Sequence, residues 1–282
     1  MPTSSPADST REFRATSTDT TAWSTGAETQ VPPPEALAAA VRARLDVLYA
    51  LAPESAHLRA SPLGPFHFRG QTCHLPRFVF FGPKASEASW RLAFFAGLDQ
   101  RDTRAADALL ATIEDLAEHA DDAHGLDLTF FPLVNAAGFF LGAPPRPLAS
   151  EHWGRSAAPE LQLLEREARA REYHGFVRVE TAHGQGDELG LRVRAPADSP
   201  LAPDVELISS EDTEPYPVRF ETGQPPLGGP LSIADDLPHG PFELTLRVPA
   251  AWPVERYRDA VRAILQRFVR RYRAFQAYGQ HL

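Results

Sequence analysis

The sequence of 282 residues contains one cysteine, Cys73. A lone thiol forms no internal disulfide, and it cannot supply the several thiolates of a structural zinc site. A disulfide framework is therefore excluded, and residence in a reducing compartment is permitted. The amino-terminal segment has no basic stretch followed by an apolar one, so we predict no secretory signal peptide and expect a cytoplasmic protein.

Long apolar runs and surplus basic charge are also missing. No run approaches the roughly 18–20 residues of a membrane span, so we expect no membrane partner. The chain has 28 Lys and Arg against 37 Asp and Glu, which gives a net charge of −9. A general nucleic-acid binder would carry a basic face, so nucleic acid is not an expected partner. No phosphate-binding glycine loop of either common type is present.

Residues 1–34 are rich in Ser, Thr, Ala and Pro and poor in large apolar side chains. Such a segment buries too little apolar surface to offset the conformational entropy lost on ordering, so we predict a disordered tail. The whole chain is 43% hydrophobic and 23% charged, which is ordinary for a globular protein. Residues 35–282 are therefore predicted to form a single domain.

Apolar periodicity divides this domain into helices and strands. We predict helices at 35–51, 103–120, 159–172 and 254–277, and strands at 77–82, 91–97, 128–134, 176–180 and 242–248. Their order predicts an α/β domain in which one mixed sheet holds these five strands and lies between layers of helices. Residues 64–82 indicate a hairpin-like region, and residues 195–240, rich in proline and glycine, indicate a long irregular region.

The stretch from Trp90 to Leu110 contains the first candidate site. A buried strand breaks at Ala96-Gly97, an acidic turn follows, and a helix begins near Thr103. Open α/β sheets present their chemistry at the carboxyl ends of strands, which is where this turn lies. Its two acidic residues, Asp99 and Asp102, are therefore candidate functional residues.

Residues 94–110, FFAGLDQRDTRAADALL, resemble the first metal-binding segment of the zinc metallocarboxypeptidase superfamily, which includes succinylglutamate desuccinylase and aspartoacylase-like amidohydrolases. That segment typically reads AGIHGDEPAG, and its His and Glu both bind zinc. Asp99 stands at the His position and Asp102 at the Glu position. The resemblance implies a zinc-carboxypeptidase-like (phosphorylase/hydrolase-like) three-layer domain with altered metal ligands.

A second segment of resemblance lies between Pro132 and Phe139, which is similar to the family turn PxxNPDGF and identifies Asn135 as a candidate substrate-binding residue. The family then has an Asn and an Arg that grip the substrate carboxylate, and Ala149 and Ser150 occupy those positions. Neither side chain can replace a guanidinium. Arg146 and Arg155 are near enough to substitute, although solvated loop residues are the simpler interpretation.

The third zinc ligand of the family is a His at the end of a strand. Counting back from Gly190 places it at His183, and counting forward from Gly175 places it at Glu180. We favour His183 because it has the family's residue type, and both assignments stay open. The last segment, Phe242–Pro249, resembles the strand that carries the family's general-base Glu, and Arg247 stands at that position. The segment after it, ILQRFVRRYRAFQAYGQHL, resembles the carboxyl-terminal helix of bacterial desuccinylase-like members.

These substitutions imply a catalytically degenerate member of the superfamily. It would act as a binding or regulatory module through the cleft in which active members bind their substrate. The resemblance implies a peptide-like or acylated amino-acid ligand and an active paralogue as an alternative partner. The altered residues at the metal positions lead us to expect no cofactor. The rival hypothesis is a divergent metal-dependent carboxypeptidase or amidohydrolase in which Asp99, Asp102 and His183 hold zinc or another divalent ion. We further predict that Arg247 replaces the ion by pairing with Asp99 or Asp102. The alternative is pairing with a loop acid such as Glu180 or Glu221.

Overall fold

A computed structural model describes residues 33–144, 146, 148, 153–184, 186–195, 216–221 and 236–279, all within one unit, Val31–Leu282. The predicted disordered tail lies outside the described residues, except for its last two. The helices are α1 (Pro34–Leu51), α2 (Thr103–Glu118), α3 (Ala136–Leu141), α4 (Pro159–Arg171) and α5 (Val254–Gly279), with short 3-10 turns η1 (Ala120–Ala123) and η3 (Trp153–Arg155). The strands are β1 (Leu58–Ala60), β2 (Leu63–Phe68), β3 (Gln71–Leu75), β4 (Phe78–Phe81), β5 (Arg91–Phe95), β6 (Asp127–Phe131), β7 (Gly175–Ala182), β8 (Leu189–Arg194), β9 (Val218–Phe220) and β10 (Phe242–Pro249).

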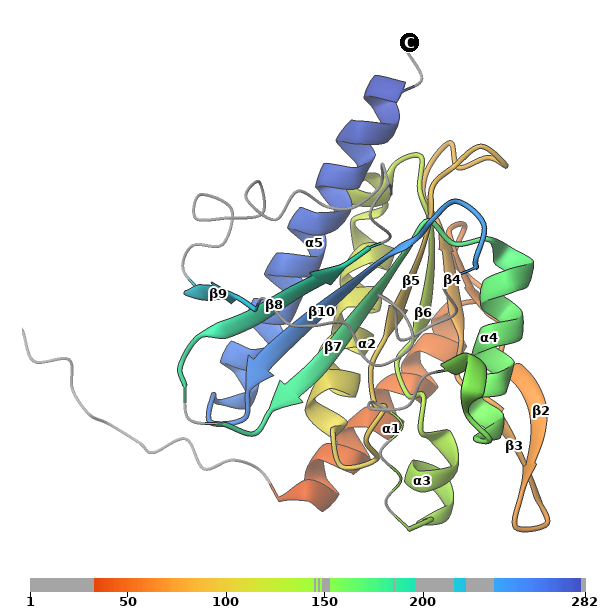
Figure 1. The fold of residues 1–282 in the computed structure, drawn as a ribbon, viewed down its shortest axis with the longest axis vertical. Helices are drawn as coiled ribbons and strands as arrows, with labels where there is room; N and C mark the ends of the chain where they lie inside the picture. The colour runs from red at the N-terminus through yellow and green to blue at the C-terminus, as the bar shows by residue number, and fades with distance from the viewer. Residues whose placement is uncertain are drawn as a thin grey trace, which may run out of the picture. The chain divides into compact units, whose positions relative to one another are not determined.

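Eight of these strands form one mixed sheet in the order β1-β4-β6-β5-β7-β10-β8-β9 (Figure 1). Strands β6, β5, β7 and β10 are parallel neighbours at its centre, whereas β4 and β8 run antiparallel to them. The prediction that five strands share one sheet and that four helices cover it is confirmed. The predicted hairpin is β2–β3, and residues 78–81 belong to the large sheet instead.

The two faces of the sheet carry separate apolar cores. Helices α1, α2 and α5 pack on one face, and α4, η3 and the β2–β3 hairpin cover part of the other, as Figure 1 shows. Strand alternation sends neighbouring aromatic side chains to opposite sides. Phe94 stacks on Phe130 in the first core, with ring centroids 4.8 Å apart, and Phe95 stacks on Phe131 in the second, at 5.2 Å.

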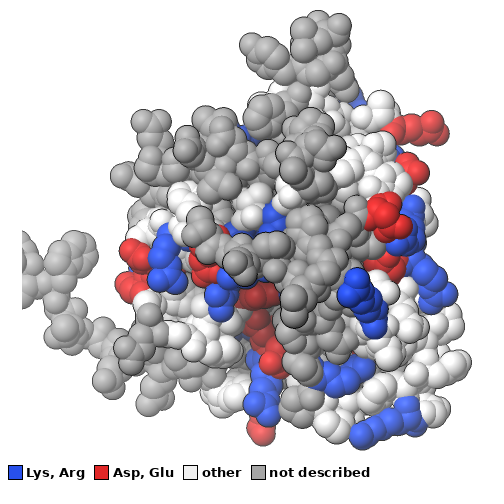
Figure 2. Space-filling model, viewed as in Figure 1, with Lys and Arg blue, Asp and Glu red and all other residues white. Residues whose placement is uncertain are grey.

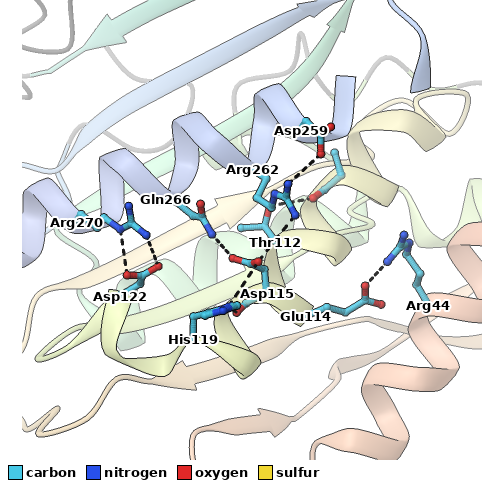
Figure 3. Close-up of polar contacts among 11 residues, drawn as sticks. Arg44, Thr112, Glu114, Asp115, His119, Asp122, Asp259, Arg262, Gln266 and Arg270 are labelled. Carbon is cyan, nitrogen blue, oxygen red and sulfur yellow. Dashed lines mark hydrogen bonds and ion pairs between the residues drawn. The ribbon is translucent and has the colours of Figure 1, made fainter. Parts of the chain in front are cut away.

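Helices α2 and α5 are joined by a row of polar contacts (Figure 3). Arg270 donates to both carboxylate oxygens of Asp122, at 3.0 and 2.8 Å, and Gln266 donates to Asp115. On the neighbouring side of α2, Arg44 of α1 pairs with Glu114. Arg262, Gln266 and Arg270, at four-residue spacing on α5, thus face acidic residues on α2 and η1.

The predicted irregular region, residues 195–240, contains a strand that the sequence did not indicate. Strand β9 pairs with β8 at the edge of the sheet. Residues 196–215 and 222–235 lie outside the described residues. None of the helices in the described part of the chain combines the length and apolarity that crossing a bilayer requires.

His174, at the amino end of β7, gives the fold a pH-sensitive contact. Burial, together with the neighbouring His239 and Arg91, lowers the pKa of His174 to about 4. The neutral ring accepts a hydrogen bond from the Arg91 backbone N–H at 3.1 Å and stacks on His239, with centroids 4.7 Å apart. Protonation of Nδ1 removes this acceptor.

We therefore expect His174 to cost about 1–2 kcal/mol of stability as pH falls from 6.5 to 4. In this window the unfolded ring takes up a proton and the folded ring does not. The partial exposure of the ring keeps the loss below the full linkage value. Urea unfolding across this range should show a shallower pH dependence for His174→Gln than for wild type. An identical dependence in both proteins would contradict the prediction.

Candidate functional site

The carboxyl end of β5 leads into the acidic turn through Gly97, whose φ of +63° lies in the left-handed region that glycine favours. Asp102 ends the turn and caps α2, because its Oδ1 accepts a hydrogen bond from the Ala105 backbone N–H at 3.2 Å. Its Oδ2 accepts from the Thr181 backbone N–H at 2.8 Å, and the Thr181 hydroxyl also donates to Oδ1. Asp102 thus ties the start of α2 to the end of β7.

Asp99 and His183 flank this contact and stay exposed. Asp99 Oδ1 accepts from the Arg101 backbone N–H at 2.9 Å, so the side chain closes its own turn. His183 lies just beyond β7 and lines a pocket of about 230 Å³ together with Asp102 and Thr181. The structure therefore brings His183 and Asp102 to one pocket and turns Asp99 to solvent.

Arg247 does not pair with Asp99 or Asp102, so that prediction is wrong, and the alternative partner Glu221 is observed. Arg247 Nη1 lies 3.2 and 3.3 Å from the two oxygens of Glu221. The register explains the error, because Arg247 is opposite Glu180 on β7 and its side chain points to the sheet face away from Val177 and Val179. Thr181, and with it Asp102, lies on the other face.

Gly190 makes room for the Arg247–Glu221 pair. It is the register partner of Arg247 on β8, and a Cβ at this position would lie 2.5 Å from Glu221 Oε1. Arg192 also donates to Glu221, at 2.7 Å. Neither Gly190 nor Arg192 was predicted from the sequence to be part of a site. The signal was the alternation of charged and apolar residues in β7, β8 and β10 (FVRVE, LRVR and ELTLR).

The same face holds a second ion cluster, nearer the middle of the strands. Arg178 is 4% exposed and pairs with Glu243 at 2.8 Å and with Glu180 at 2.6 Å. Glu180, the second candidate for the third ligand position, is therefore engaged by a guanidinium. His183 lies beyond this strand and lines the pocket described above. Both His183 and Glu180 therefore remain candidates for the third ligand position.

The candidate substrate-binding residues near α3 are tied to the protein. Asn135 is fully buried and accepts a hydrogen bond from the Gly138 backbone N–H at 3.0 Å, which caps α3. Arg146 is not a solvated loop residue, because it pairs with the fully buried carboxylate of Glu160. Arg155 is exposed. Ala149 and Ser150 lie outside the described residues.

The residues at the three ligand positions do not fit a resident zinc ion. Zinc needs lone pairs directed at one point and an open position for water. Both oxygens of Asp102 are occupied by three donors, and Asp99 is engaged by its own turn. Within the described ranges, no three His, Cys, Asp or Glu residues are grouped so as to hold a metal.

Asp102 gives a testable electrostatic consequence. Burial raises the pKa of its carboxyl group more than its hydrogen bonds to Thr181 and Ala105 lower it. The folded state therefore keeps this proton more readily than the unfolded state, and Asp102 contributes more stability as pH falls. We expect the stability advantage of wild type over Asp102→Asn to be larger near pH 4 than near pH 7. Chemical denaturation at both pH values tests this, and a constant advantage would contradict it.

No family model and no curated protein matches this sequence. Solved structures do match the fold. A metallo-carboxypeptidase from Pseudomonas aeruginosa, in complex with (2-guanidinoethylmercapto)succinic acid, has a TM-score of 0.60 and 16% identity over 81% of this chain and 68% of its own. A metallo-carboxypeptidase from Burkholderia cenocepacia has the same score and identity over 83% and 68%.

Thrombin activatable fibrinolysis inhibitor is also similar, with a TM-score of 0.60 and 11% identity over 87% of this chain and 74% of its own. At such identities the likeness concerns the backbone arrangement alone. It agrees with the mixed eight-stranded sheet and with the segments quoted from the sequence. The chain therefore has the fold of the zinc metallocarboxypeptidases.

Proposed function

We propose that this protein is a catalytically degenerate metallocarboxypeptidase-like protein that acts as a binding or regulatory module. The observation that carries the proposal is the Arg247–Glu221 pair. At the sequence position where the resemblance expects the general base, the chain has a permanent cation, and this side chain lies on the sheet face opposite Asp102. A guanidinium has no lone pair to accept a proton from an attacking water.

The metal-ligand positions support the same proposal. Asp102 is used to hold α2 against β7, so it serves the fold instead of an ion. Hydrolysis by the family mechanism needs the metal and the base together. A chain that lacks both the metal and the general base has neither of the two groups that activate water in the family mechanism.

We propose a peptide-like or acylated amino-acid ligand. The similar protein from Pseudomonas aeruginosa holds a succinic acid derivative, which carries two carboxylates. In this chain, the half of the sheet formed by β7, β10 and β8 presents guanidinium groups on the face that carries Arg247. Carboxylates are the natural partners of such groups.

Metal analysis combined with hydrolysis assays tests the proposal. Protein purified without added ions, and protein incubated with zinc, should bind less than stoichiometric zinc and should not hydrolyse peptides or N-acyl amino acids above the buffer rate. The rival hypothesis, a divergent metal-dependent hydrolase, predicts one zinc per chain and turnover that Asp102→Ala abolishes. That result would overturn the proposal.

A further inference from the structure

Three arginines converge on one carboxylate at the edge of the charged sheet face. Glu221, 13% exposed, lies 2.7 Å from Arg192, 3.2 Å from Arg247 and 3.9 Å from Arg219. The arginines come from β8, β10 and β9, and Gly190 leaves the space in which the carboxylate sits. Figure 2 shows basic and acidic side chains side by side on this face of the molecule.

The cluster keeps unused capacity for an anion. Among the described residues, three guanidinium groups contact the single carboxylate of Glu221, which compensates one of their three positive charges. Charge-assisted hydrogen bonds are typically about 2.7–2.9 Å long, and only Arg192 reaches that distance. Arg219 makes no hydrogen bond within the described part of the chain and is 65% exposed. The buried Nε of Arg192 also has no acceptor among the described residues.

We propose that Arg192, Arg219 and Arg247 form a binding site for the oxyanion of a small ligand, with Glu221 as its internal competitor. The guanidinium groups would donate hydrogen bonds to a carboxylate or a phosphate. Both groups carry a negative charge and several acceptor oxygens on one central atom. Glu221 holds the arginines in place without a ligand and limits the affinity for one. The inference rests on the proposed function, because it names the group by which the ligand is held.

The site differs from the pocket at Asp102 and His183. Asp102 bonds to Thr181, whose side chain lies on the α2 face of β7, whereas Arg247 lies on the opposite face. A ligand at the arginines therefore needs neither the metal-ligand positions nor a metal. Its binding and the hydrolysis assay can be scored separately.

Titration calorimetry with sodium succinate and with sodium phosphate, at matched ionic strength in sodium chloride, tests the site. We expect saturable binding to wild type and about tenfold weaker binding to Arg219→Gln and Arg247→Gln. Arg219 is exposed enough for its variant to fold normally. Arg262→Gln on α5 removes the same charge elsewhere and should bind as wild type does. A preference for succinate identifies a carboxylate ligand, and a preference for phosphate identifies a phosphorylated one.

Glu221→Gln distinguishes a binding site from a structural ion cluster. Removing the internal competitor should tighten anion binding by about tenfold, and the anion should raise the melting temperature of this variant more than that of wild type. A purely structural cluster would lose stability without gaining affinity. Absence of saturable binding in both wild type and Glu221→Gln overturns the inference, as does equal affinity in the arginine variants. If turnover with zinc were found instead, only the proposed function would fail.

Discussion

Replacing Asp107 with alanine is expected to lower the free energy of unfolding by about 3–4 kcal/mol. Its side chain is 2% exposed and lies among three helices. Arg44 of α1 donates to Oδ1 at 2.7 Å, and Arg258 of α5 donates to Oδ2 at 3.0 and 2.9 Å. Removing the carboxylate leaves the guanidinium of Arg258, 30% exposed, without its acidic partner, and leaves that of Arg44, 25% exposed, with Glu114 alone.

Urea unfolding of Asp107→Ala measures this loss, and Asp259→Ala is the matched control. Asp259 also pairs with an arginine of α5, at 3.1 Å, but it is 52% exposed (Figure 3). Exposed pairs of this kind contribute about 0–1 kcal/mol, so the control should stay within that range. Similar losses of unfolding free energy in the two variants would show that the burial of Asp107 does not determine its contribution to stability.

The Arg146–Glu160 pair should respond asymmetrically to substitution. Glu160 has no exposed surface, whereas the Arg146 side chain is 23% exposed and lies over the Phe68 ring, 4.9 Å from its centroid. Arg146→Met strands a carboxylate in the interior, which should cost about 3–5 kcal/mol at neutral pH. Glu160→Gln leaves a guanidinium that can turn to solvent, so about 1–2 kcal/mol is expected.

Chemical denaturation of the two single variants and of the double variant at neutral pH measures the asymmetry. The double variant should be more stable than Arg146→Met alone, since it leaves no buried charge. Equal costs for the two single variants would refute the asymmetry.

The centre of the fold could be predicted from the sequence because burial leaves a plain signal there. Strands β5 and β6 are buried on both faces and rich in apolar residues, as is usual for strands inside a parallel sheet. Helix α1 repeats Leu37, Val41, Leu45 and Leu48 on one face, and Pro34 begins it. The edge strand β9 has three residues and one exposed side chain, so its pairing through the backbone leaves almost no trace in the sequence.

The sequence identified which positions of the candidate site are altered, but it did not decide which residues their side chains contact. Linear spacing identified Arg247 and Asp102 as the altered residues, yet it could not say which way their side chains point. That depends on strand register, because a shift of one residue moves every side chain to the other face. Glu221 follows a strand that had been assigned to a loop. The sequence offered Glu221 as one alternative partner of Arg247, and the pairing of β9 with β8 is what brings its carboxylate to that side chain.

The place of β10 in the sheet has a consequence for how the chain is made. It is the last strand of the described residues, yet it lies between β7 and β8, which precede it by about 50 residues or more. During synthesis on the ribosome, β7 and β8 must wait with open edges until residue 249 has emerged. Such edges invite pairing with other chains. A nascent chain stalled before β10 should therefore recruit chaperones or aggregate, however stable the finished protein is.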